Sequence, residues 1–193
     1  VGYRHFITSS VPTAFPFGHG LSYTTFRYGR ISLSEMRISA AGSLEVGVEL
    51  SNVGDVDGAE VVQLYVRELR PSVYRPDREL RAFAKVRLAP GESTAVTLTL
   101  GPRAFAHWDV GGGRWRVTAG TYALLVGASA EDIRAEAEVL VGDDDDASGA
   151  PSRLHAPPLD DAALSALGVH IGPPEAAAPY GVNSTMEEVS RSG

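Results

Sequence analysis

The sequence predicts an all-β protein whose strands form a two-sheet β-sandwich. About seven short segments between residues 25 and 142 alternate apolar and polar residues, which is typical of strands that bury one face. Turn-forming residues (Gly, Pro, Asn and Asp) separate these segments at short intervals. No part of this region repeats apolar residues with the period of a helix. Together these observations favour a sandwich over a helical or mixed fold.

The composition is that of an ordinary globular protein, and it argues against several kinds of partner and site. The chain has 193 residues, 44% hydrophobic and 21% charged, so one domain with a sizeable core is expected. Its net charge of −7 argues against nucleic acid as a partner. The absence of cysteine excludes disulfides and thiolate metal sites. No apolar run approaches the roughly 20 residues that span a membrane, so we expect no membrane partner.

The chain begins with two apolar segments. Residues 1–6 carry aromatic and β-branched side chains and predict a short strand. Residues 15–24 read FPFGHGLSYT, in which Pro16 fixes its own backbone and Gly18 and Gly20 allow angles or close approaches that a Cβ forbids. Because a flexible linker would be polar, we expect this second segment to be clamped onto another surface.

Strands follow in order along the rest of the domain. They are predicted at residues 26–33, 44–51, 59–68, 80–88, 94–100, 115–118, 120–126 and 133–141. The alternation in 44–51 is strict, as in a half-buried strand. Both faces of 59–68 are largely apolar at its start, so we expect this strand to be central in its sheet.

The segments between the predicted strands also contain residues typical of particular turns and loops. Residues 52–58 are rich in Asn, Asp and Gly and predict a turn. Residues 89–92, Ala-Pro-Gly-Glu, place Pro and Gly at the two middle positions of a type II turn. Residues 69–77 form a Pro-containing loop that can project Tyr74. Tyr122, near the start of a late strand, fits the tyrosine corner of immunoglobulin-like sandwiches.

Seven motifs resemble, in the same order, the C-terminal part of family 3 glycoside hydrolases, the β-glucosidase and β-xylosidase family. The motifs are residues 2–6 with 15–24, 52–54, 60–66, 79–86, 88–92, 108–109 and 126–129. The resemblance implies an immunoglobulin/fibronectin type III-like sandwich with an extended N-terminal linker. It implies three regions: 1–14, the terminal strand of a missing α/β sandwich domain; 15–24, an interdomain linker; and 25–142, the fibronectin type III-like domain. Beyond the resemblance, composition predicts that residues 143–193 are an acidic, Pro-rich linker and poorly ordered tail.

The resemblance also implies a function. The parent enzyme would release β-linked glucose, or a similar sugar, from non-reducing ends with retention. In the family the nucleophile is an Asp of an N-terminal barrel, and the acid/base Glu usually lies in the α/β sandwich domain. Neither motif is present here, so we assign no catalytic residue to this chain. Its expected partners are the missing catalytic domains of the same enzyme.

The interface with those domains is expected at the linker. The residues predicted to pack there are Phe15, Phe17, His19, Leu21 and Tyr23. His19 is open to three interpretations: a packed ring, a hydrogen bond across the interface, or a contact to the substrate. The alternative to an accessory domain is a free-standing carbohydrate-binding or protein-interaction β-sandwich.

Local carboxylates are better explained by structure than by catalysis. Asp55 and Asp57 lie in a turn, where Asp is favoured for backbone reasons. Glu79 is expected to pair at the base of a loop, and Asp109 to form a turn or a cap. The acidic run 143–146 is expected to be a solvated linker rather than a calcium site.

No cofactor or metal is predicted, because the histidines are scattered and no i, i+4 pair occurs. Lys85 is the single lysine among many arginines, which is typical of a GC-rich bacterial genome. The compartment is left open, cytoplasmic or secreted.

Exposed aromatic residues are the remaining candidates. Sugars stack on flat rings, so Tyr74, Trp108 and Trp115 are candidates for a carbohydrate platform. The competing interpretation is that both tryptophans fill the sandwich core or its end. Tyr74 is the better placed of the three, because it lies on a Pro-flanked loop that can project, and the resemblance implies that this loop leans towards the catalytic domains.

Overall fold

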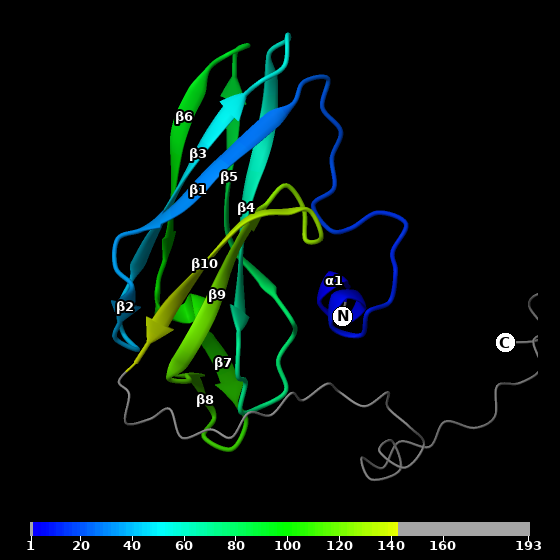
Figure 1. The fold of residues 1–193 in the computed structure, drawn as a ribbon. Helices are drawn as coiled ribbons and strands as arrows, with labels where there is room; N and C mark the ends of the chain where they lie inside the picture. The colour runs from blue at the N-terminus through cyan, green and yellow to red at the C-terminus, as the bar shows by residue number, and fades with distance from the viewer. Residues whose placement is uncertain (1, 143–193) are drawn as a thin grey trace, which may run out of the picture. The chain divides into compact units, whose positions relative to one another are not determined.

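A computed structural model describes residues 2–142, and it confirms the all-β sandwich (Figure 1). One sheet has the order β1-β3-β6, with β1 at Phe26–Leu33, β3 at Leu44–Asn52 and β6 at Ser93–Leu100. The other has the order β2-β10-β9-β4-β5, with β2 at Arg37–Ile38, β10 at Ile133–Val141, β9 at Gly120–Gly127, β4 at Gly58–Glu68 and β5 at Glu79–Leu88. The pairs are antiparallel except β2 with β10. Strand β4 lies between β9 and β5, so its predicted interior position is confirmed.

The predicted linker and tail of residues 143–193, with the acidic run, lie outside the described residues.

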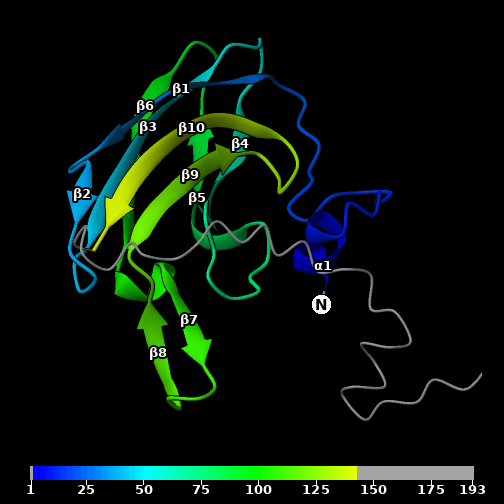
Figure 2. The same ribbon diagram turned by 60° about the horizontal axis from the view of Figure 1, so that its bottom comes forward.

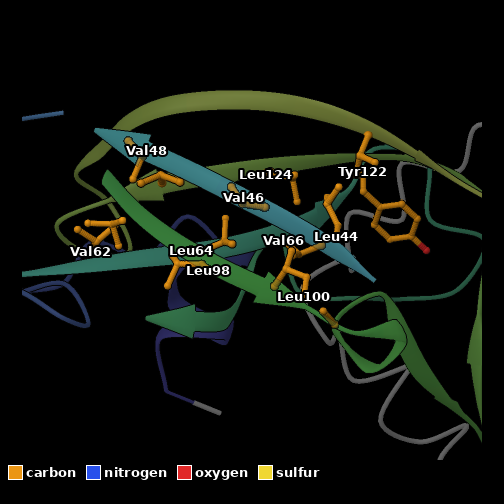
Figure 3. Packing of buried hydrophobic residues seen from close by; sticks show 14 of the residues in the cluster. Leu44, Val46, Val48, Val62, Leu64, Val66, Leu98, Leu100, Tyr122 and Leu124 are labelled. Carbon is orange, nitrogen blue, oxygen red and sulfur yellow. The ribbon is translucent and has the colours of Figure 1, made fainter. Parts of the chain in front are cut away.

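The core lies between the two sheets. Alternate residues of β3 and β6 point inward, and they meet alternate residues of β4 and β9 (Figure 3). Val46 and Leu98 on one side and Leu64 and Leu124 on the other are all buried. Each such side chain contributes roughly 1.5–3 kcal/mol when it leaves water. The period-two pattern of the sequence therefore builds the core directly.

Two predicted local structures are confirmed. Gly91 has φ +74°, and the Glu92 amide donates to the Ala89 carbonyl at 3.1 Å, as a type II turn requires. The Tyr122 hydroxyl donates to the Thr118 carbonyl at 2.8 Å, which is the hydrogen bond of a tyrosine corner.

A β-hairpin extends from one end of the sandwich, and the sequence predicted only one of its two strands. It follows the short 3₁₀ helix η1 (Pro102–Ala104) and pairs β7 (Ala106–Asp109) with β8 (Arg114–Val117). Only the second strand was predicted, because four residues with two bulky rings show too little alternation. Figure 2 shows the hairpin extending away from the two main sheets.

The strand predicted over residues 1–6 is wrong, because Tyr3–Thr8 forms the short helix α1. Aromatic and β-branched residues favour a strand where a neighbouring strand can pair with them. Within the described residues this segment pairs with no strand, and a helix lets Tyr3 and Ile7, four residues apart, point to the same side. That side packs on the outer face of the five-stranded sheet (Figure 1).

Helix α1 explains why this outer face is apolar. Tyr65, Ala123, Leu125 and Ala130 form a second buried cluster on the side opposite the main core, and Tyr3 packs against it. The double-sided apolar pattern of β4 therefore reflects two cores, one between the sheets and one beneath the N-terminal residues.

Candidate functional site

The candidate site is the N-terminal segment, defined here as residues 9–25 between α1 and β1. It carries all five residues predicted to pack at an interface. Leu21 is 95% exposed and Tyr23 is fully exposed, and Phe15 is also largely in solvent. Phe17 is partly covered by α1, and the His19 ring lies 5.4 Å from that of Phe15.

The backbone of the segment is anchored in its middle. The Phe17 ring stacks on Tyr3 with centroids 4.4 Å apart. The Phe17 carbonyl accepts a hydrogen bond from the Ala130 amide at 2.8 Å. The next carbonyl, of Gly18, accepts from Nε2 of Gln63 at 3.3 Å. The clamping expected from the sequence is thus present within the domain itself.

Gln63 is the residue that sequence reasoning missed. It is buried on β4, where its Nε2 also donates to the Ala128 carbonyl at 2.6 Å and its Oε1 accepts from the Tyr65 hydroxyl at 2.5 Å. A polar residue inside an apolar strand run was the available signal, since buried polar groups need partners.

Of the two glycines singled out in the sequence, only Gly18 has a backbone conformation that favours glycine. Its φ is +81°, and an added Cβ would collide with the Gln63 amide. An added Cβ on Gly20 would meet no atom within 4 Å. The glycine requirement is therefore local to the point where the segment crosses Gln63.

The end of the segment is anchored by Asn52. Its Oδ1 accepts from the Thr24 hydroxyl at 2.6 Å and from the Gly54 amide at 3.1 Å. Its Nδ2 donates to the Val56 carbonyl at 2.8 Å and the Leu88 carbonyl at 3.1 Å. The buried amide thus ties the segment, the following turn and β5 together.

Helix α1 is held by polar contacts at the start of β5. The Leu80 amide donates to the Tyr3 hydroxyl, and the Asp77 amide donates to the Thr8 hydroxyl, both at 2.8 Å. Arg4 forms an ion pair with Glu79 at 2.6 Å. The residues before the segment are therefore fixed to the same domain.

The carboxylates weighed in the sequence have structural roles. Glu79 also pairs with Arg81 at 2.6 Å, so the predicted pairing at a loop base is confirmed. Asp109 accepts from the Gly112 amide at 3.2 Å, which confirms a turn. Asp57 pairs with Arg87 beside the predicted turn.

Two carboxylates paired with arginines, buried Glu68 and partly exposed Asp77, have opposite pKa shifts. Burial raises the pKa of Glu68 even though Arg75 donates to it at 2.8 Å. Burial acts in the same direction on Asp77, but hydrogen bonds from Arg78 and Arg67, each 2.7 Å long, outweigh it and lower the pKa of Asp77. Two strong donors on one carboxylate account for the difference.

A second feature is the aromatic basin, a hollow of about 640 Å³ lined by Tyr74, Trp108 and Trp115 among other residues. Trp108 is 50% exposed and Trp115 is 45% exposed, so neither fills the sandwich core, and of the competing interpretation only the position at the end of the sandwich holds. Their rings contact each other edge to face, with centroids 5.5 Å apart. They lie outside the core because the hairpin that carries them extends beyond both sheets (Figure 2).

Among residues 2–142, no group of three or more His, Asp or Glu side chains is placed to hold a metal ion. The helices of this region are also too short or too polar to cross a membrane.

Comparison with known proteins identifies the domain. A family model described as fibronectin type III-like domain matches residues 60–130. The chain is 45% identical over 141 residues to the thermostable β-glucosidase B of Acetivibrio thermocellus, and 49% identical over 139 residues to a β-glucosidase of Rhizobium radiobacter. It resembles the crystal structure of a GH3 β-glucosidase from Bifidobacterium adolescentis, with a TM-score of 0.69 and 41% identity.

These relatives are much longer than the matched region. The alignments cover 73%, 72% and 73% of this chain, but 19%, 17% and 20% of the three relatives. The chain thus spans about a fifth or less of the length of each relative and corresponds to one part of these longer proteins. The resemblance carried by the seven motifs is confirmed. The chain belongs to the family 3 glycoside hydrolases and contains the accessory fibronectin type III-like domain of that family.

Proposed function

We propose that the chain is the C-terminal accessory part of a retaining β-glucosidase and braces its catalytic domains without supplying a catalytic residue. The parent would release β-linked sugars from non-reducing ends, in keeping with the relatives named β-glucosidase. Residues 1–14 would end the neighbouring α/β sandwich domain, and residues 15–24 would connect it to the sandwich described here.

One observation carries this proposal: apolar side chains are exposed on an anchored backbone. The N-terminal segment is tied down at Phe17, Gly18 and Thr24, yet Leu21 and Tyr23 contact solvent. Clustered exposed apolar groups mark interaction surfaces. Burying each large side chain against a second domain would contribute roughly 1.5–3 kcal/mol.

The carboxylates support a non-catalytic role. A retaining glycosidase needs two carboxyl groups about 5–5.5 Å apart, both reaching the substrate. Glu68 and Glu79 both contact Arg75, but Glu68 is buried, and Glu79 is occupied by Arg4 and Arg81. The free-standing alternative is disfavoured because each relative described above carries this region inside a much larger enzyme.

The bracing role can be tested in a chimera. The matching region of the Rhizobium radiobacter β-glucosidase is replaced by this chain, and activity on an aryl β-glucoside confirms that the chimera assembles. Leu21→Ser should then lower the stability of the chimera by about 1.5–3 kcal/mol, since it removes a buried anchor. In the isolated chain, where Leu21 is exposed, the same change should alter stability by less than about 0.5 kcal/mol.

Met36→Ser is the matched control, because Met36 is 71% exposed and lies outside the segment. It should have little effect in either protein. A chimera that loses no stability with Leu21→Ser, or loses as much with Met36→Ser, would show that the segment is not the bracing surface.

A further inference from the structure

The aromatic basin is built from three separate parts of the chain. Tyr74 comes from the loop between β4 and β5, Trp108 and Trp115 come from the β7–β8 hairpin, and Arg4 comes from α1. Its volume of about 640 Å³ lies within the range of small-molecule sites, roughly 300–1,000 Å³.

Arg75 fixes the loop and the hairpin relative to each other. It is buried next to Tyr74, and it pairs with Glu68 at 2.8 Å. Its guanidinium also donates to the carbonyls of Phe105 at 3.0 Å and Ala106 at 3.4 Å, at the base of the hairpin. The aromatic rings of the basin are therefore held on a prepared framework, which limits the entropy lost when a ligand binds.

The aromatic rings of the basin differ in whether a ligand can stack on their faces. The Arg103 guanidinium lies 3.4 Å from the centroid of the Trp115 ring, so one face of this ring is occupied. Trp108 and Tyr74 are each about half exposed and are available for stacking. The face of an aromatic ring is electron-rich, and it attracts weakly positive C–H groups such as those on the flat side of a pyranose.

The charges of the basin indicate a neutral ligand. Its arginines Arg4, Arg75 and Arg81 are all engaged with Glu79, and Arg75 is also engaged with Glu68. An anion would have to compete with these carboxylates. Polar groups that can bond to hydroxyls remain, including Asp109 and His107 in the same hollow. The Arg81 Nε–H has no hydrogen-bond partner among the described residues.

We propose that the aromatic basin binds a neutral pyranose oligosaccharide, with its sugar rings stacked on Trp108 and Tyr74. This would be a carbohydrate-binding site carried by the accessory domain itself. The choice of a β-linked glucose oligosaccharide as the probe rests on the proposed β-glucosidase function, but the basin itself does not.

The chain carries its own reporter for this site. It contains two tryptophans, and both line the basin, so all of its tryptophan fluorescence comes from there. Titration of the 193-residue chain with cellotriose, and separately with xylotriose, should give a saturable change in emission. Tyr74→Ala keeps both fluorophores and should weaken binding by about tenfold, equivalent to about 1.4 kcal/mol.

Tyr23→Ala is the control, since Tyr23 is a fully exposed ring outside the basin, and this variant should bind the sugars as the unchanged chain does. Trp108→Ala, followed by calorimetry, repeats the test if Tyr74→Ala fails to fold. If xylotriose gives a saturable change and cellotriose does not, the result supports sugar binding in the basin. The same result would count against a β-glucosidase as the parent enzyme.

No saturable change with either sugar up to about 20 mM would overturn the proposal and favour a protein segment as the occupant. Equal weakening by Tyr23→Ala and Tyr74→Ala would overturn it as well. The chimera experiment on Leu21 is unaffected by either result, so the two proposals fail independently.

Discussion

At the scale of single residues, Asn52 shows how one buried amide joins distant parts of the chain. Asn52→Ala should lower the free energy of unfolding by about 2–3 kcal/mol, because it leaves the buried Leu88 carbonyl and the Thr24 hydroxyl without their partner. Urea unfolding measures this directly.

The control for Asn52 is Asp55→Ala, an exposed residue of the neighbouring turn, which should change stability by less than about 0.5 kcal/mol. Equal losses for the two variants would mean that the turn as a whole, and not the buried amide, holds this region.

Asp77 predicts a pH dependence of stability. Its pKa is lowered in the folded state, so its contribution is fully present above the unfolded value of about 3.9 and is lost as pH falls through the folded value. Asp77→Asn should therefore destabilise the domain at about pH 7, and the deficit should shrink at about pH 2. Urea unfolding of both proteins at the two pH values checks this. A deficit that is the same at both would contradict an ionised Asp77 as the source.

At the scale of elements, the N-terminal segment depends on one glycine and not on its neighbour. Gly18→Ala should destabilise the domain by about 2–3 kcal/mol, since it combines a positive φ with a collision against Gln63. Gly20→Ala should change stability by less than about 0.5 kcal/mol, because space is open there. Thermal unfolding of the two variants decides the point, and equal effects would show that the anchor at Gln63 does not hold in solution.

Helix α1 and the β7–β8 hairpin are two elements that the local sequence pattern did not predict correctly. Residues 3–6 of the predicted strand lie in a helix because the surface on which the helix packs includes Tyr65 and Leu125, far away in the sequence. For Trp108 and Trp115 the sequence left a carbohydrate platform and a place in the core or at its end both open, and the structure puts them on a hairpin that extends beyond the core. In both cases a tertiary contact overrides propensity.

At the scale of the whole molecule, the domain should be folded but inactive alone. The purified 193-residue chain should show a β-rich circular dichroism spectrum and no hydrolysis of aryl β-glucoside or β-xyloside above buffer. Persistent turnover after rigorous purification would contradict the accessory role and direct attention to Glu79 and Asp109, the carboxylates that line the basin.

The sequence by itself determined the sandwich, its main strands, the type II turn at Gly91 and the tyrosine corner at Tyr122. These are set by side-chain alternation and by the backbone limits of single residues, which act over a few positions. It also indicated which five residues of the N-terminal segment would pack at an interface: Phe15, Phe17, His19, Leu21 and Tyr23. Only the tertiary structure decided that Gln63 and Asn52 anchor this segment, that α1 covers a second core, and that Tyr74 meets Trp108 in one basin. Such contacts join residues far apart in the chain, and no local pattern encodes which of them will meet.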